Sequence, residues 1–182
     1  RLADVQRTML GELLYDFNGR SRKTQMALAE SFGFTEWAQP AGGCCFLTDP
    51  NYSHKLADLW QARGSKEYEL DDIMLLKVGR HLRPRPNFKL IVAREDGENN
   101  FLTGYRRQFA HLEPISHGGP LTLVDGVLDE ADLELAARIV GRYSQGREAA
   151  QVTVRYTPLG AQPREITVAP LPVAQLPAHW HL

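Results

Sequence analysis

The sequence predicts an α+β fold, in which an N-terminal helical segment is followed by a small mixed sheet with packed helices. Apolar residues recur at helical spacing through the first part of the chain. From about residue 80 onward, short runs rich in β-branched residues alternate with helical stretches. The chain has 182 residues, of which 43% are hydrophobic, so it is long enough to bury a core of this kind.

A break in both patterns predicts two parts. Residues 63–66 place a glycine and a serine between two cations, which interrupts the helical spacing on either side. We therefore divide the chain into residues 1–65 and residues 66–182. The first part is expected to hold three helices, at residues 1–15, 22–32 and 50–62.

Capping residues support the second and third of these helices. Ser21 precedes the second helix and Gly33 follows it, as is preferred at the two ends of a helix. Thr48 or Asp49 is placed to cap the third helix, which then has Pro50 near its first position. Both helices are therefore expected to begin and end close to these residues.

The second part is expected to contain the sheet. Helices are expected at residues 71–78, 98–107 and 129–143, and strands at residues 88–93, 112–116, 121–124, 151–157 and 165–169. Pro158-Leu159-Gly160 separates the last two strands, which are expected to pair as a hairpin. The proline-containing tail after Pro170 is expected to lie extended on the surface.

Charge, hydropathy and cysteine content limit the classes of function. The formal net charge is −1, so the global charge does not point to a polyanionic partner. No run approaches the roughly 18 apolar residues of a membrane span, so no membrane segment is expected. The two cysteines, Cys44 and Cys45, are adjacent, and a disulfide between neighbours would close a strained ring. This usage favours a reducing compartment and hence a cytoplasmic protein.

The chain begins at Arg1 rather than at a methionine, and its first residues already belong to the first predicted helix. Such a start is expected for the C-terminal piece of a longer protein. It is equally expected for a protein from which a tag or a leader has been removed. Both explanations stay open at this point.

The loop that contains the cysteines is the first candidate for chemistry. Gly42 and Gly43 let the backbone approach a ligand, and a thiol beside them near a helix start can have a lowered pKa. Cys44 would then suit a sulfur carrier. The residues alone favour the alternative, a buried structural cysteine beside a tight turn. Adjacent cysteines lack the spacing of metal ligands, so no metal site is expected.

A cluster of cations at the start of the second helix is the next candidate. Arg20, Arg22 and Lys23 lie where backbone N–H groups also point outward, and together they could hold a phosphate. Taken alone, the cluster fits a solvated charged turn better.

The stretch from Lys77 to Arg107 is the third candidate, and here we favour binding. It holds eight cations against three carboxylates. Arginine suits phosphate because its guanidinium fork can bind two oxygens. His81, Phe101 and Tyr105 lie among these cations and could stack on bases. The alternative is a salt-bridged surface without a ligand.

Several of these pieces together resemble a known family. The motifs are Gly19-Arg20-Ser21-Arg22-Lys23, Gln25, Leu28-Ala29, Pro40-Ala41-Gly42-Gly43-Cys44 and Leu47-Thr48-Asp49-Pro50. In this order they resemble the C-terminal half of thiouridylase-like PP-loop proteins, which are related to tRNA thiouridine synthases. The motifs that follow, Lys77-Val78-Gly79-Arg80-His81, Leu90-Ile91-Val92-Ala93-Arg94 and Glu98-Asn99-Asn100, are similar to the small RNA-binding domain of the NFACT proteins. The resemblance covers roughly residues 10–110.

This resemblance implies an RNA-binding C-terminal region of a tRNA sulfurtransferase. In such proteins an N-terminal ATP-binding domain adenylates a base oxygen, and a cysteine persulfide delivers sulfur. Cys44 matches the motif cysteine, with Cys45 as the other candidate thiol. The implied RNA contacts are Arg80, His81, Arg83, Arg94 and Asn99, extended by Arg20, Arg22 and Lys23. Ala93 stands where the family has glycine, and Asp96-Gly97 also departs from its pattern.

The implied partners are tRNA, a sulfur-donor protein and the missing ATP-binding domain. The Ser-Gly-Gly-x-Asp-Ser loop that would bind ATP is not found in the sequence, so no cofactor is expected in this chain and it should be inactive alone. Two other classes remain open. The basic stretch could bind an acidic protein partner instead of RNA, or the chain could be a freestanding thiol-dependent enzyme built on Cys44.

Overall fold

The computed structural model describes residues 22–36, 46 and 49–182. The predicted helix at residues 1–15, the loop at residues 40–43, Arg20 and both cysteines lie outside the described residues. The chain forms two compact units, Arg1–Cys44 and Cys45–Leu182. In the first unit, helix α2 (Lys23–Ser31) follows Arg22 and ends just before Gly33, close to the predicted bounds.

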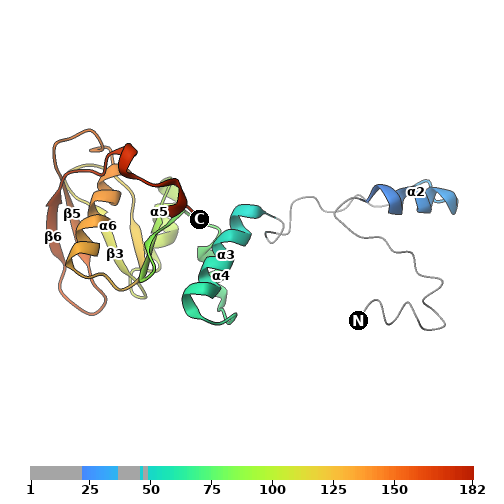
Figure 1. The fold of residues 1–182 in the computed structure, drawn as a ribbon, viewed down its shortest axis with the longest axis horizontal. Helices are drawn as coiled ribbons and strands as arrows, with labels where there is room; N and C mark the ends of the chain where they lie inside the picture. The colour runs from blue at the N-terminus through green and yellow to red at the C-terminus, as the bar shows by residue number, and fades with distance from the viewer. Residues whose placement is uncertain (1–21, 37–45, 47–48) are drawn as a thin grey trace. The chain divides into compact units, whose positions relative to one another are not determined.

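A six-stranded sheet is the centre of the second unit (Figure 1). Its strands, in spatial order, are β1 (Arg80–Arg85), β2 (Phe88–Val92), β4 (Thr122–Gly126), β3 (Ala110–Pro114), β5 (Val152–Thr157) and β6 (Arg164–Val168). Every neighbouring pair is antiparallel. The α+β class is therefore confirmed, with an antiparallel sheet in the place of the small mixed one.

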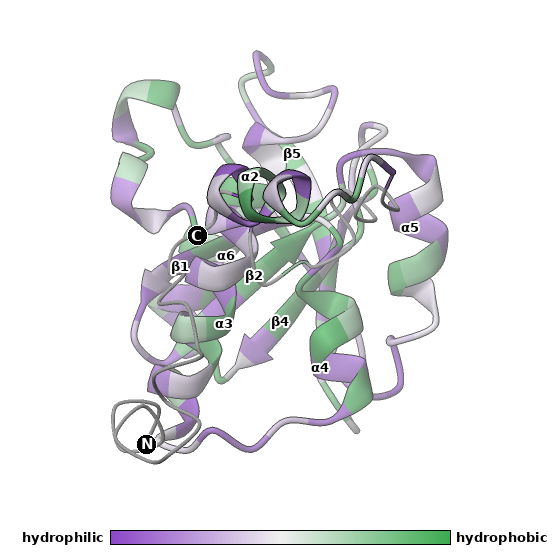
Figure 2. Cartoon of the chain, turned by 90° about the vertical axis from the view of Figure 1, so that its right-hand side faces the viewer, coloured by the Kyte–Doolittle hydropathy of each residue, from purple (hydrophilic) through white to green (hydrophobic). Residues whose placement is uncertain are grey.

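One face of the sheet packs against helix α6 (Glu130–Arg142). Asp129 caps this helix by accepting a hydrogen bond from the Asp132 amide at 2.7 Å, as the sequence predicted. The buried residues of this layer are Leu82, Phe88, Leu90, Val92, Leu112, Val124, Leu133, Ala136, Ala137, Ile139, Val140, Val152, Val154, Val168 and Leu171. Strands β2 and β4 are correspondingly coloured mainly as hydrophobic (Figure 2).

The opposite face packs against helices α4 (Leu70–Leu75) and α5 (Asp96–Thr103). Because successive side chains of a strand alternate between faces, Ile91 and Leu123 point to this second layer. Strand β2 is therefore buried on both faces, and apart from Lys89 all of its residues are apolar.

Helix α3 (Pro50–Arg63) also belongs to the second unit. Asp49 caps it by accepting a hydrogen bond from the Asn51 amide at 2.8 Å, and Gly64 ends it with φ 67°. Its apolar residues pack with Leu76 and Ile73 beside α4. The compact unit thus includes α3, which the division at residue 65 had placed with the N-terminal part.

Strand β1 is the strand of this sheet that the sequence analysis did not predict. It reads Arg-His-Leu-Arg-Pro-Arg, which has neither a β-branched residue nor an apolar run. It lies at the edge of the sheet, where Pro84 is tolerated. Its outer side meets the C-terminus, where Leu82 forms a bridge with His181 and the Leu182 amide donates to the His81 carbonyl at 3.1 Å.

The tail after Pro170 is more ordered than the extended surface segment that was expected. It contains two short 3₁₀ helices, η3 (Val173–Gln175) and η4 (Ala178–Trp180). Trp180 packs against the core layer of α6. The tail therefore covers the edge of β1, which would otherwise present unpaired backbone groups. Among the described helices, none is long and apolar enough to cross a membrane.

Candidate nucleic-acid interface

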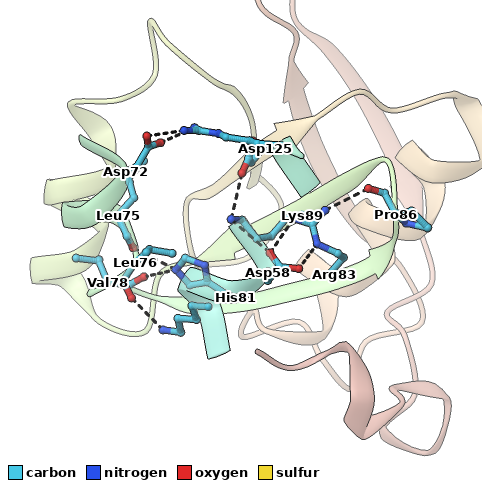
Figure 3. A network of polar contacts seen from close by, with 12 residues as sticks. Asp58, Asp72, Leu75, Leu76, Val78, His81, Arg83, Pro86, Lys89 and Asp125 are labelled. Carbon is cyan, nitrogen blue, oxygen red and sulfur yellow. Dashed lines mark hydrogen bonds and ion pairs between the residues drawn. The ribbon is translucent and has the colours of Figure 1, made fainter. Parts of the chain in front are cut away.

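Two cations of the predicted basic stretch, the half-buried Arg83 and the buried Lys89, form ion pairs with carboxylates of α3 and β4 (Figure 3). Asp58 of α3 accepts two hydrogen bonds from the Arg83 guanidinium, one of them from Nη2 at 2.8 Å. Lys89 is only 2% exposed, and its Nζ lies 3.1 Å from Asp125 Oδ2 and 3.8 Å from Asp58 Oδ2. We call these four residues the α3 ion network. Its cations fasten α3 to the sheet, and their charges are compensated by these two carboxylates.

His81 is also buried, with 1% of its surface exposed. Its Nε2 lies 3.1 Å from the Leu75 carbonyl and 3.0 Å from the Val78 carbonyl, so Nε2 carries the proton and donates to both. Burial, followed by the charges of Lys55 and Lys89, lowers the pKa of His81 to about 3. A neutral, enclosed imidazole joins α4 to β1 and is out of reach of a base on the surface.

Three further arginines of the stretch are paired with carboxylates. The pairs are Arg85 with Asp132, Arg94 with Glu98, and Arg106 with Glu113. Five of the eight cations in the stretch are therefore paired with carboxylates, as the alternative of a salt-bridged surface predicts for these residues. Lys77, Arg80 and Arg107 make no ion pair within the described part of the chain.

Glu98 fixes the start of helix α5 and the loop before β1. Partial burial alone would raise the pKa of Glu98, but hydrogen bonds from the Arg94 guanidinium and from the Gly79 and Arg94 amides lower it to about 2. The Arg94 amide lies 2.7 Å from Glu98 Oε2. Arg94 is thus held in one place, with about half of its side chain exposed.

A pocket of about 650 Å³ lies beside Arg94, and four arginines line it. We call it the arginine pocket. Its lining residues are Arg80, Ala93, Arg94, Glu95, Asp96, Asn99, Gly118, Gly119, Pro120, Arg142, Tyr143, Ser144, Gln145 and Arg147. They come from the start of β1, the turn between β2 and α5, the loop between β3 and β4, and the end of α6.

Two of the pocket's arginines have few competing partners. The Arg80 guanidinium lies over the Tyr143 ring, 5.3 Å from its centroid, which leaves its N–H groups able to meet an anion. Arg147 is exposed and makes no ion pair with any described residue. Arg142 contacts Glu148 at 3.5 Å, but Glu148 is 83% exposed, so this pair is weak.

The walls of the arginine pocket are tied to each other. The backbone amide of Gln145 donates to the Gly118 carbonyl at 2.8 Å, which joins the loop between β3 and β4 to the end of α6. A Cβ at Gly119 would lie 2.6 Å from Pro114 Cγ and 2.8 Å from Ser144 Cβ, so a glycine is needed for this approach. The pocket is therefore built before any ligand arrives.

A second pocket, of about 370 Å³, continues from the first. We call it the lysine pocket, because Lys55 and Lys77 line it together with Arg80 and Arg94, which it shares with the arginine pocket. Burial, assisted by the charge of Arg94, lowers the pKa of Lys55, whose Nζ donates to the Leu76 carbonyl at 3.3 Å. The two pockets together form what we call the arginine groove.

The structure keeps some of the predicted site residues together and separates others. Arg80, Arg94 and Asn99 line the arginine groove. Asn99 also has a structural role, since its Oδ1 accepts a hydrogen bond from the Leu121 amide at 2.8 Å. Arg22 and Lys23 lie at the start of α2 in the first unit. Arg20, Cys44 and Cys45 lie outside the described residues.

Sequence reasoning missed three residues of the arginine pocket, Arg142, Tyr143 and Arg147. Arg142 stands in the last turn of α6, where a cation is ordinarily explained by the helix dipole. The available signal for a binding surface was the close spacing of these three residues at the end of a capped amphipathic helix. For metals, no group of three or more His, Cys, Asp or Glu side chains is placed to hold an ion within residues 22–36, 46 and 49–182.

Residues 79–181 match the family described as NFACT protein RNA binding domain. The C-terminal part of the fibronectin/fibrinogen-binding protein from Streptococcus suis is similar with a TM-score of 0.46 and 13% identity. That similarity covers 54% of this chain and 48% of the other, so the chain spans about half the length of that structure. No curated protein matches the sequence.

Proposed function

The chain belongs to the family of NFACT RNA-binding domains, and from this premise we propose that it binds RNA along the arginine groove. The observation that supports this placement is the meeting of cations from distant parts of the sequence. The groove is lined by Lys55, Lys77, Arg80, Arg94, Arg142 and Arg147 against the carboxylates of Asp49, Glu95 and Asp96. A surplus of positive charge in a concave surface attracts a phosphate backbone and speeds its association.

Charge balance separates this surface from the rest of the basic stretch. Arg83 and Lys89 are neutralised by Asp58 and Asp125, whereas Arg80 and Arg147 make no ion pair within the described residues. Arg80 keeps its guanidinium fork, which can bind two phosphate oxygens at once. We therefore assign the main charge contacts with the RNA to Arg80 and Arg147, with Arg94 held beside them by Glu98.

We further propose that the RNA is a tRNA and that the chain acts in tRNA thiolation. The resemblance of roughly residues 10–110 to thiouridylase-like PP-loop proteins supports this role. In that setting Cys44, or its neighbour Cys45, would carry sulfur from a donor protein after an N-terminal ATP-binding domain has activated the base. Arg20, Arg22 and Lys23 would extend the RNA surface, and the protein would work in the cytoplasm.

A salt titration of RNA binding tests the proposed function. The full chain is titrated into fluorescent total tRNA at several salt concentrations, alongside an Arg80→Gln and Arg147→Gln double variant. We expect wild-type affinity to fall steeply with salt, and the double variant to bind more weakly with a salt slope smaller by about two. Equal slopes for the two proteins, or no tRNA binding by the wild type, would contradict the proposal.

Arg155→Gln serves as the matched control. Arg155 lies on β5, outside both pockets, and already pairs with Glu113 and Glu165. Removing this cation should leave the affinity for tRNA and its salt slope unchanged. An acidic protein partner is the other class of ligand for such a groove. Displacement of the tRNA by polyglutamate at equal charge concentration, with no preference for RNA, would favour that class instead.

A further inference from the structure

The arginine pocket contains hydrogen-bond acceptors as well as cations, which a surface made only for phosphate does not need. Glu95 and Asp96 line it beside the four arginines, and both carboxylates are exposed. A carboxylate repels phosphate but accepts hydrogen bonds from the N–H groups on the edge of a base. The amides of Asn99 and Gln145 add groups that can both donate and accept.

The pocket also has the size and the aromatic surface that one nucleotide requires. Its volume of about 650 Å³ falls in the range of pockets that enclose small ligands, about 300–1,000 Å³. Arg80 and Tyr143 lie against each other at its wall, so a base can stack on this pair. The partners of a base pair cannot enter such a hollow while they remain stacked in a helix.

On the basis of the proposed RNA-binding function, we propose that the arginine pocket takes up a single unpaired nucleotide. The base stacks on the Arg80–Tyr143 pair and its edge meets the acceptors at the start of α5, while Arg142 and Arg147 hold the flanking phosphates. The lysine pocket, which shares Arg80 and Arg94, receives the neighbouring backbone. The RNA that this protein prefers is therefore a helix interrupted by a bulge or a loop, not a continuous duplex.

The structure of the pocket explains why it suits this ligand. Its walls are already joined by the hydrogen bond from the Gln145 backbone amide to the Gly118 carbonyl, and Glu98 holds Arg94 in place. A prebuilt site spends little free energy on ordering its own side chains, which leaves more for stacking on the base. Stacking of a base on an aromatic side chain contributes about 1–3 kcal/mol, or roughly 5- to 150-fold in affinity.

The test compares three RNAs that differ at one position. The full chain is titrated by fluorescence anisotropy against a blunt duplex, the same duplex with one bulged nucleotide, and the same bulge with an abasic nucleotide. We expect the bulged duplex to bind about tenfold more tightly than the blunt one, with the abasic bulge close to the blunt duplex. Equal affinity for all three RNAs would overturn the inference while leaving the proposed function standing.

Two variants localise the preference to the pocket. Tyr143→Leu keeps apolar bulk against the core and removes the ring, and Gln145→Ala changes an exposed wall residue. Both should lose preference for the bulge while still binding the blunt duplex. A full preference for the bulge in both variants, with far-UV circular dichroism unchanged, would place the nucleotide elsewhere and overturn the inference. No binding of any RNA by the wild type would defeat the proposed function as well.

Discussion

The α3 ion network and the arginine groove use the same residue types for opposite purposes. In the network, Arg83 and Lys89 are enclosed with Asp58 and Asp125, and their charges hold a helix to a sheet. In the groove, four arginines from three segments stand around a hollow that is lined by fewer carboxylates than arginines. Arg80 and Arg83 are three residues apart on one strand, yet they fall into different groups. Burial and the position of carboxylates, not local sequence, decide which cation can meet a ligand.

Asp58→Ala should have the largest effect, because it leaves Arg83 without its carboxylate partner and removes the more distant of the two carboxylates beside Lys89. Removing one partner of a buried ion pair typically costs about 3–5 kcal/mol. We expect the free energy of unfolding, measured with urea, to fall by that amount. The control is Glu134→Ala, at an exposed position of α6, which should change stability by less than about 0.5 kcal/mol. A similar small loss in both variants would mean that the network contributes little.

Gly79→Ala should have the next largest effect. Gly79 directly precedes strand β1, which carries Arg80 of the groove and Arg83 of the network. Its φ is 76°, and a Cβ would lie 2.9 Å from the Val92 carbonyl oxygen. Backbone strain and this contact together should cost roughly 1–3 kcal/mol in urea unfolding. Gly160→Ala is the matched control, since Gly160 has φ 71° with nothing within 4 Å of the added Cβ. A loss at Gly79 no larger than at Gly160 would show that the Val92 contact does not matter.

The pH dependence of the free energy of unfolding should show that His81 is buried in its neutral form, unlike the exposed cations of the groove. The folded-state pKa is about 3 against an ordinary 6.5, so the unfolded chain binds more protons between these values. His81 therefore contributes its full stability above about pH 6.5, and this stability is lost as the pH falls toward 3. The loss should be about 1.4 kcal/mol per pH unit below 6.5.

The His81→Gln variant provides the comparison for this measurement. Its amide can still donate to a backbone carbonyl, but it does not titrate. Urea unfolding at pH 7 and at pH 5 should show a smaller pH slope in the variant than in the wild type. Glu98 does not obscure this window, because its stability is present above about pH 4.5 and is lost as the pH falls toward its folded pKa of about 2. Identical slopes in the two proteins would contradict burial of a neutral His81.

Glu148→Gln should have the smallest effect, and it acts on the groove alone. Glu148 is 83% exposed and lies 3.5 Å from Arg142, so their pair contributes about 0–1 kcal/mol. Removing its charge should leave urea stability unchanged and raise affinity for RNA by about twofold or less. Weaker RNA binding in this variant would show that Glu148 positions Arg142 rather than competing with the ligand.

The sequence predicted most of the elements whose secondary structure is determined by their own residues. Strand β2 is apolar apart from Lys89, and α3 and α6 have capping aspartates and amphipathic spacing. Strand β1 could not be predicted in this way, because its inward polar side chains are compensated by residues elsewhere. Arg83 is paired with Asp58, twenty-five positions earlier, and His81 donates to carbonyls of the segment around α4.

The candidate site was predicted less completely than the fold, for a related reason. The motif around Gly79 and Arg80 includes one residue that lines the arginine pocket, Arg80, but it could not separate arginines that are free of carboxylates from those that are paired. Arg142 and Arg147 complete the arginine pocket from the end of α6, far from that motif in the sequence. Packing of α6 against the face of the sheet that includes β1 brings these segments together, and packing between elements distant in the sequence is not visible in local patterns.

Chemical footprinting of the arginines tests the central claim most directly. The full chain is treated with phenylglyoxal with and without a bulged RNA duplex, and modification is read residue by residue by mass spectrometry. We predict that RNA protects Arg80, Arg142 and Arg147, that Arg155 reacts equally in both samples, and that Arg83 reacts slowly in both. Protection of Arg155 by RNA, with Arg80 and Arg147 left equally reactive, would contradict the account.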